Sequence, residues 1–528
     1  MNRTACTVLT ILLLATGIAR AEVHSATRYT VIISDLHLGL GCATKTTCHP
    51  FEDFRWTDDL RRFLAELSAR THNNADLVLN GDTFELWQSE DQPCTSGRSH
   101  DQSCTEREAV ERLTAIAKMH ATDLQLLKDF AAQGDNRLLI VPGNHDAALL
   151  FEQVFAALGP YIGDSPRVLF LDHGYFLSDD KKLYAEHGHQ FDEINRFTHW
   201  QENDQRAAPF TTTAGVKYLQ RPWGEEFVQS FYNTYEKQYE IIDNIAGEIN
   251  GIRYGLAAEG IAGALVSVGR FAKFFVLRQS VRQFRDLLDA PQAENTVPSD
   301  WDIAKIRAQG DVFFEESVPR DDPTRALMKQ ARTQGLLETH VNDLTTDEIQ
   351  QICEFRHALA TTYATTHKGA SPVIERCTDK HLRAISKAAL SLIEGDKLRW
   401  QYIQARQRDL RQSGRLPNDE VFDIVVMSHT HSERGPIDIR GRDPRAWHPV
   451  FYDTGAWQRI VTVAEVELMR GTKKRSQVLT DYKVDDLRPC YTAVIIPPYE
   501  QKSKPTAELD TWRPNAAGTW TLAPGTCH

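Results

Sequence analysis

The stretch YTVIISDLHLG, residues 29–39, decides how the rest of the sequence is interpreted. Its first part, Tyr29–Ser34, is a short apolar run rich in β-branched residues, which is typical of a buried strand. Asp35 and His37 follow directly. Because they are two positions apart, a chain that is still extended there places both side chains on one face. The stretch therefore predicts a strand that ends in two polar, metal-competent side chains.

The same arrangement recurs along the chain. Polar motifs close five predicted strands, and in chain order they are DLH (35–37), GDTFE (81–85), GNHD (143–146), HGH (187–189) and HTH (429–431). The strands before the later four are Asp76–Asn80, Arg137–Val141, Lys182–Glu186 and Phe422–Ser428. Helical spacing over Thr57–Arg70 and Glu106–Gln133 separates the early strands, which predicts an α/β sheet. Ligands gather at the carboxyl ends of such strands, so we expect the five loops to converge.

The residue types in these loops suit a pair of divalent metal ions. Carboxylate and imidazole ligands favour Mn, Fe or Zn over the oxygen-only cages of Ca or Mg. Asp82, a singly placed acid, is suited to bridge two ions. Two ions about 3.5–4 Å apart activate a water and hold both oxygens of an in-line displacement at phosphorus. Each motif alone is a weak signal, whereas five in order favour a common site over five structural uses.

Taken together, DLHLG, NGDTFE, PGNHD, EHGH and SHTH resemble the motifs of the calcineurin-like metallophosphoesterases. The resemblance covers roughly residues 28–200 and 420–465, and it implies an α/β fold, an αββα sandwich, with a dinuclear metal centre. Carried over residue by residue, it implies that Asp35, His37 and His431 hold one metal. It implies a second metal at Asn144, His187 and His429, with Asp82 as the bridge.

The resemblance also implies roles for two residues that are not metal ligands. His145 is the expected proton donor or phosphate-orienting group, and a side chain whose pKa lies near neutrality suits a general acid. Glu85 lies where the family often places an acid that orients this histidine. An acid near the positive end of a helix is the alternative for Glu85. His189 is expected to line the pocket at most.

Two segments resemble one branch of that family more closely. GDTFELW and HGHQFD are similar to the UDP-2,3-diacylglucosamine hydrolases, and Asp453-Thr454-Gly455 resembles the late N-T-G loop of related enzymes. Two departures argue against that substrate. The chain has His145 where that branch carries arginine, and its amino terminus predicts export, away from a cytoplasmic lipid precursor.

Residues 1–21 predict a secretory signal peptide. Arg3 supplies the positive start, Val8–Ile18 the apolar region, and Ala19–Ala21 the cleavage site. The apolar run is shorter than the ~20 residues of a membrane-spanning helix; an uncleaved anchor or a buried helix is the alternative. We expect a secreted or periplasmic protein.

The cysteines agree with export. An even number remains once Cys6 leaves with the signal, which indicates disulfides, although the sequence cannot choose among the pairings. Our working assumption is nearest-neighbour pairing, namely Cys42–Cys48, Cys94–Cys104, Cys353–Cys377 and Cys490–Cys527. The first two pairs follow predicted strands and are expected to line the rim of the site.

The expected domain order is a signal peptide (1–21), a first core part (22–205), a helical insertion that serves as a lid or cap (206–419), and a second core part (420–528). A long helix is expected to end near Gly414. The apolar segment Leu256–Leu277 indicates a core hairpin of the insertion, and a membrane-touching or lipid-receiving surface is the alternative. Further strands are expected at Pro449–Asp453 and Arg459–Leu468.

The formal net charge of −12 disfavours a nucleic-acid polymer as partner, because coating phosphates requires a positive field. We expect an exported, dinuclear-metal-dependent phosphoesterase that hydrolyses a small phosphate mono- or diester, or a phospholipid-like one, by attack of a metal-bridging hydroxide. Alternatives are a phospholipid or nucleotide-sugar pyrophosphate hydrolase selected by the lid, a nuclease-like phosphodiesterase, and a noncatalytic binding protein of this fold. The complete set of seven metal positions with His145 argues against the last.

Overall fold

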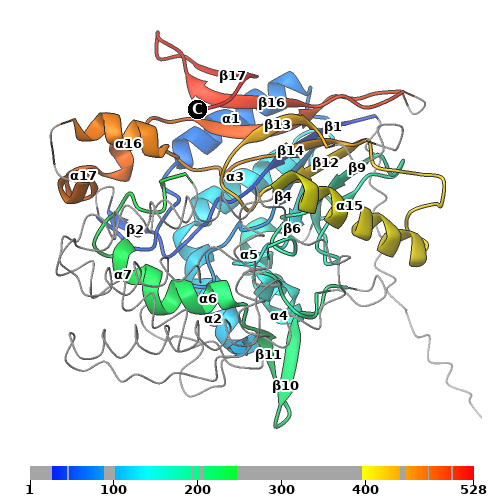
Figure 1. Ribbon diagram of the computed structural model, residues 1–528, viewed down its shortest axis with the longest axis horizontal. Helices are drawn as coiled ribbons and strands as arrows, with labels where there is room; N and C mark the ends of the chain where they lie inside the picture. Colours follow the sequence, from blue (N-terminus) through cyan, green and yellow to red (C-terminus); the bar gives the residue numbers. More distant parts are fainter. Residues whose placement is uncertain are drawn as a thin grey trace, which may run out of the picture.

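The computed structural model of the chain is shown in Figure 1. It describes residues 27–44, 47–88, 101–163, 165–192, 195–200, 206–246, 395–439, 448–471, 473, 475–500 and 503–528. The expected signal peptide, the segment Leu256–Leu277 and the pair Cys353–Cys377 lie outside these residues. None of the helices in the described part is long and apolar enough to cross a membrane.

The first sheet has seven strands in the order β17-β16-β15-β1-β4-β6-β7. Their bounds are β1 Tyr29–Ile33, β4 Ala75–Asn80, β6 Arg137–Val141, β7 Val168–Phe170, β15 Tyr491–Ile496, β16 Glu508–Pro514 and β17 Trp520–Pro524. Strands β1, β4, β6 and β7 are parallel. Strand β15 runs antiparallel beside β1 and connects it to β16 and β17. The three strands expected at the start of the chain are confirmed within one residue.

The second sheet has five strands in the order β13-β14-β12-β9-β8. Their bounds are β8 Phe176–Leu177, β9 Leu183–Ala185, β12 Ile424–Met427, β13 Arg434–Asp438 and β14 Val450–Asp453. The parallel centre of this sheet is β9, β12 and β14. Strand β12 is fully buried and lies between β14, which follows it in the chain, and β9, which is distant from it in sequence. The carboxyl ends of both sheets therefore carry the motifs that the sequence singled out.

Alternate side chains of the strands pack on opposite faces and build four layers. One face of the first sheet, with Val31 and Leu77, packs against helices α1 Thr57–Arg70, α2 Glu106–Met119 and α3 Ala121–Ala132. The other face, with Ile32 and Val78, packs against Val426 and its neighbours in the second sheet. The far face of the second sheet packs against α15 Gly395–Gln412. These layers, visible in Figure 1, confirm the expected αββα sandwich.

The helical region expected over Glu106–Gln133 is two helices rather than one. Helix α2 begins at a capping box between Thr105 and Glu108, and it ends at His120, from which α3 starts. The His120 ring is buried and contacts Asp123 at 2.9 Å and Glu52 at 3.2 Å. The two short helices α4 Glu152–Ala156 and α5 Gly159–Ile162 follow β6.

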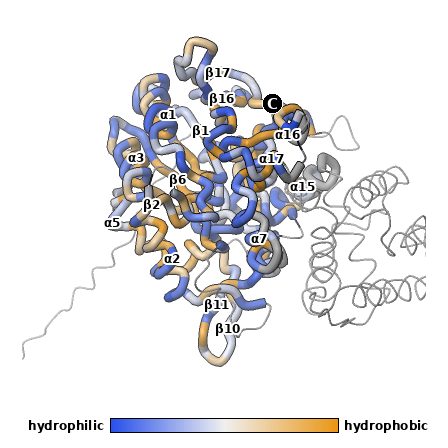
Figure 2. Tube along the Cα trace, turned by 90° about the vertical axis from the view of Figure 1, so that its left-hand side faces the viewer, coloured by the Kyte–Doolittle hydropathy of each residue, from blue (hydrophilic) through white to orange (hydrophobic). Residues whose placement is uncertain are grey.

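The first described part of the expected insertion joins the core of the domain. Strands β10 Phe210–Thr213 and β11 Val216–Gln220 form a hairpin that pairs with β5 Gln102–Thr105. This hairpin projects from one end of the molecule in both views (Figures 1 and 2). Helix α6 Trp223–Phe227, a π-helical turn at Val228–Tyr232 and helix α7 Asn233–Glu236 follow. Tyr239, Ile241 and Ile245 then enter the main hydrophobic cluster. The boundaries of the insertion stay a prediction.

The strand expected at Arg459–Leu468 is wrong. Residues Val463–Arg470 form helix α16, because Thr462 caps the helix and Glu465 returns a hydrogen bond to the backbone of Thr462. Helix α17 Arg475–Asp481 packs beside it. The capping box outweighs the β-branched composition that suggested a strand.

Two of the expected disulfides are present, Cys42–Cys48 and Cys490–Cys527. The first joins the two short strands β2 Cys42–Thr44 and β3 Thr47–Cys48. Cys104 is also disulfide-bonded, and its expected partner Cys94 lies outside the described residues. Disulfides are typical of proteins from oxidising compartments.

Candidate metal centre

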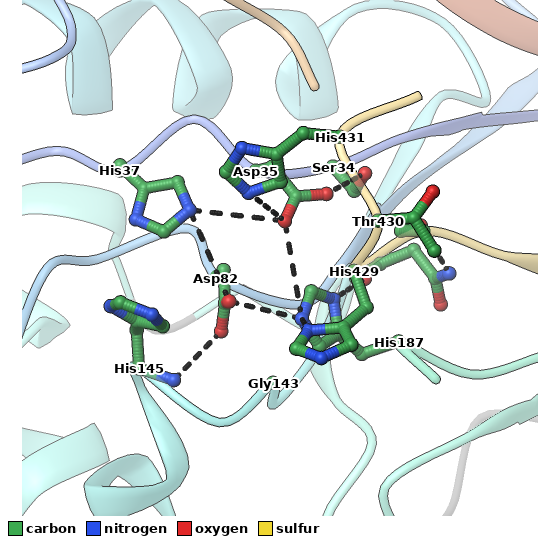
Figure 3. A network of polar contacts seen from close by, with 12 residues as sticks. Ser34, Asp35, His37, Asp82, Gly143, His145, His187, His429, Thr430 and His431 are labelled. Carbon is green, nitrogen blue, oxygen red and sulfur yellow. Dashed lines mark hydrogen bonds and ion pairs between the residues drawn. The ribbon is translucent and has the colours of Figure 1, made fainter. Parts of the chain in front are cut away.

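The five polar motifs meet at the carboxyl ends of the two sheets. Asp35, Asp82, His187, His429 and His431 lie around one centre, as Figure 3 shows. The loop after β1 continues along the loop after β4, with hydrogen bonds from the backbone N–H of Asp35 to Gly81 and of His37 to Asp82. The expected convergence of the motifs is therefore found.

The backbone of these loops is not extended, in contrast to the expectation for Asp35 and His37. Five residues of the site have a left-handed φ, between 40° and 54°, namely Asp35, His37, Asp82, His429 and His431. Such angles cost side-chain-bearing residues of order 1–3 kcal/mol and concentrate at functional sites. The strands end before the motifs, and the sharp bends then turn the side chains toward one point.

The first potential metal site consists of Asp35, His37 and His431. Oδ1 of Asp35 lies 3.2 Å from Nε2 of His431 and 3.8 Å from Nε2 of His37. Metal–ligand bonds are about 2.0–2.2 Å long, so two atoms that share an ion lie at most about 4.4 Å apart. All three ligand atoms are within 4.8 Å of one another. Both distances from Asp35 are within the limit, which makes these three residues candidates to hold one ion.

The second potential site consists of Asp82, His187 and His429. Oδ2 of Asp82 lies 2.9 Å from Nε2 of His187 and 3.9 Å from Nε2 of His37 in the first group. The other oxygen of Asp82, Oδ1, accepts a hydrogen bond from the backbone of His145 at 2.8 Å. One oxygen of Asp82 thus faces both groups while the other holds the next loop.

Asn144 follows β6 in the chain, between Gly143 and His145, and is 1% exposed. Both polar atoms of its side chain are buried without a hydrogen-bond partner, as are Oδ1 of Asp35 and Nε2 of His37. Buried polar atoms are rarely left unsatisfied, because each costs about 1–3 kcal/mol. These orphaned atoms belong to expected ligand residues, so the donor set fits bound cations.

Two glycines allow the loops to approach this closely. A Cβ on Gly143 would lie 2.2 Å from Oδ1 of Asp82, and one on Gly81 would lie 2.4 Å from the ring of His187. Gly81 also has a φ of +93°, which favours glycine. Without these two glycines, Asp82 could not lie against both neighbouring loops.

Hydrogen bonds on the outer side fix which histidine nitrogens face the centre. His187 donates from Nδ1 to the carbonyl oxygen of Asn80 at 3.0 Å, which leaves Nε2 for a metal. His429 donates from Nε2 to Asp192 at 3.1 Å, so its Nδ1 points toward His187. Asp192 also accepts from Asn195 at 2.7 Å. We did not identify Asp192 from the sequence, although it lies within the quoted HGHQFD segment.

His145 is held by Glu85. Nδ1 of His145 lies 2.5 Å from Oε2 of Glu85, and Nδ1 of His37 lies 3.0 Å from the same oxygen. His37, Glu85 and His145 form a third group with metal-ligand spacing. We interpret it as a hydrogen-bonded group, because Glu85 uses the outer nitrogen of His37 and leaves Nε2 toward Asp35. The carboxylate is a hydrogen-bond partner of both rings, and the orienting role expected for Glu85 stays a prediction.

The carboxylates and histidines of the centre shift one another's pKa values toward the charged forms. Burial alone would raise the pKa of Asp35, but His187 and His431 hold it below its usual range. Burial would likewise raise the pKa of Asp82, but the charges of His187 and His145 lower it well below its usual value. Burial lowers the pKa of His145, whereas Glu85 and Asp82 raise it above its ordinary value. The carboxylates are therefore ionised at neutral pH.

A chain of polar side chains joins the two sheets beneath the centre. Asn80 donates to Ser428 at 2.9 Å, Ser428 contacts Thr454 at 2.8 Å, and Thr454 contacts Ser34 at 2.7 Å. Ser34 and Asn80 follow or end strands of the first sheet, and the other two belong to the second. Through these hydrogen bonds, the Asp453-Thr454-Gly455 loop connects the two sheets.

Asp146 has a structural role that the sequence did not indicate. Its buried carboxylate accepts hydrogen bonds from the backbone of Gly143 at 2.6 Å and Thr83 at 2.8 Å. It thereby fastens the loop after β6 to the loop after β4. His189, in contrast, packs its ring edge-on against Trp200 at 4.5 Å and is outside all three ligand groups, so its expected place in the lining of the pocket stays a prediction.

An αββα sandwich with carboxylate, imidazole and amide groups gathered at its strand ends defines a class of metal-dependent hydrolases. Residues 29–254 match the family model of the calcineurin-like phosphoesterases, which supports a metallophosphoesterase domain in this part of the chain. Strand β12 with His429 and His431 lies beyond the matched range. A search of curated proteins found no match to the chain. The family indicates metal-dependent hydrolysis of phosphoesters in general.

Proposed function

We propose that the protein is an exported phosphoesterase that hydrolyses a small phosphate mono- or diester with two divalent metal ions. The observation that carries the proposal is the position of Asp82. Its Oδ2 lies within ligand-sharing distance of His187 on one side and His37 on the other. A carboxylate oxygen between two groups of histidines is the arrangement expected of a bridging ligand.

One ion would bind Asp35, His37 and His431, the other Asn144, His187 and His429, with Asp82 shared. Imidazole, carboxylate and amide ligands suit Mn, Fe or Zn. When bound, such a pair supplies an activated water and neutralises charge on the phosphate. The rigid, bent loops and the outer hydrogen bonds to Asn80 and Asp192 would hold the ligands in place before an ion arrives.

His145 would protonate or orient the leaving oxygen. Its side chain is 15% exposed, and Nδ1 is bound to Glu85, so Nε2 is the nitrogen available to a substrate. Glu85 would keep the ring in one tautomer and favour its protonated form. General-acid assistance of this kind contributes typically ~10²–10⁴-fold in rate.

Export is supported by two observations. The amino-terminal residues have the three parts of a signal peptide, and the described residues include the disulfides Cys42–Cys48 and Cys490–Cys527. The acidic charge supports a small phosphoester rather than a nucleic acid as substrate. The expected insertion, whose ends at residues 206–246 and 395–419 pack into the core, would supply the lid that selects among esters.

Asp82→Asn tests the metal assignment. The amide keeps the shape of the side chain but supplies a weaker, neutral ligand to both ions, so metal content should fall at both sites and turnover of 4-nitrophenyl phosphate and bis(4-nitrophenyl) phosphate should be nearly abolished. Asp58→Asn, at an exposed position of α1, is the control and should bind two metals per chain. Normal metal content and rate in Asp82→Asn would refute the dinuclear proposal.

A further inference from the structure

Trp87 is a buried residue that the sequence analysis did not assign to the site. Its indole stacks on the ring of His145, with centroids 4.0 Å apart and planes inclined by 25°. Trp87 is 2% exposed, yet it belongs to none of the three hydrophobic clusters of the described chain. One face of its indole lies against a polar ring at the candidate metal centre.

Three contacts restrict His145 in different directions. Glu85 binds its Nδ1 in the plane of the ring, Trp87 covers one face, and the edge of His37 lies 4.7 Å away at 82°. A hydrogen bond to Nδ1 alone would still allow the imidazole to rotate about that bond. The stacked indole removes this freedom.

The backbone of Trp87 is itself fixed by the same acid. The N–H groups of Trp87 and Gln88 donate to Oε1 of Glu85 at 2.8 and 3.0 Å, while Oε2 binds the histidines. The carbonyl oxygen of Trp87 accepts from Gln229, in the segment expected as the insertion, at 2.8 Å. Glu85 and Trp87 thus form one rigid unit around His145.

We propose that Trp87 is a positioning residue: its indole holds the imidazole of His145 in the orientation that places Nε2 against the leaving group of a phosphoester. This inference rests on the proposed function. Stacking requires an aromatic face rather than the indole N–H, and Nε1 of Trp87 is buried without a partner within the described residues. Phenylalanine should therefore replace tryptophan without losing a hydrogen bond.

The test compares Trp87→Leu with the matched control Trp87→Phe in metal-loaded protein, using 4-nitrophenyl and alkyl esters of the same phosphate type. A small displacement of a reacting group costs up to about 10²-fold, so Trp87→Leu should lose about tenfold or more in kcat on the alkyl ester. The nitrophenyl group leaves without a proton, so its kcat should change less than about threefold. Trp87→Phe should stay close to the wild type on both esters.

Two further measurements separate positioning from a general structural defect. In the His145→Ala background, Trp87→Leu should cause no additional loss on the alkyl ester, because interacting residues are non-additive. In metal-free protein with labelled histidine, the ring protons of His145 should be shifted by the stacked indole, and Trp87→Leu should abolish that shift.

An equal loss on both esters, an additive double mutant, or unshifted His145 protons would overturn the positioning role. If wild-type protein with two bound metals hydrolyses neither ester, the proposed function itself fails. These results are distinct, because the spectrum of His145 reports the stack without any turnover.

Discussion

Gly143→Ala is a one-methyl perturbation whose effect follows from the packing of Asp82. The added Cβ would lie 2.2 Å from Oδ1 and 2.6 Å from the backbone nitrogen of Asp82, whereas ordinary contacts begin at 3.4 Å. Rotation of a side chain cannot relieve a clash with the backbone. One of the two loops must therefore shift by about 1 Å, and a displacement of that size costs about 10²-fold in rate.

The assay is the rate of 4-nitrophenyl ester hydrolysis together with the metal content of each preparation. Gly159→Ala is the matched control, because a Cβ there meets nothing within 4 Å. Position 159 opens helix α5, where alanine is favoured over glycine by up to about 1 kcal/mol. We expect Gly143→Ala to lose about 10²-fold in kcat/KM and part of its metal, with thermal stability of the metal-free protein measured alongside. Wild-type rate and metal content in Gly143→Ala would refute the proposed packing.

Two further predictions concern stability and export. Burial lowers the pKa of His120, but Glu52 and Asp123 outweigh it and raise the pKa from 6.5 to about 9. The protonated ring should therefore contribute on the order of 3 kcal/mol to folding below pH 6.5, and this contribution should be lost as the pH rises through about 9. Thermal unfolding of metal-free His120→Gln and wild type at pH 6 and pH 9.5 checks the sign, and a difference that does not shrink with pH contradicts it. For export, the mature chain should begin at Glu22 and contain no free thiol; intact mass before and after alkylation without reductant tests both, and retained Met1 or alkylated cysteines would be against it.

The sequence predicted the parts of the site that depend on local order. A buried strand that ends in polar residues can be recognised from a few letters, and parallel strands bring such ends together. The expected ligands Asp35, Asp82 and His187 are therefore found around one centre. The bends could not be predicted, because the left-handed angles of Asp35 and His37 result from contacts with the loop after β4.

Residues that act through contacts distant in sequence were missed. Asp192 is recognisable only once His429, 237 positions away in the chain, lies beside it. Trp87 looks like an ordinary core residue until His145 packs on its ring. The prediction for Arg459–Leu468 failed for a different reason. Its valines favoured a strand, but Thr462 and Glu465 form a capping box, and the structure has a helix there.

The position of β12 has a consequence for how the protein is made. His187 and His429 are 242 positions apart, yet β12 is the strand that joins β9 to β14. During synthesis, the edge of β9 that faces β12 stays unpaired until this late strand is made, and such edges are prone to wrong pairing. Closure of such a distant contact is slow, so the incomplete sheet is exposed to wrong pairing until β12 is in place. A fragment that stops at residue 254 would keep the family match but would lack this strand and two histidines of the centre.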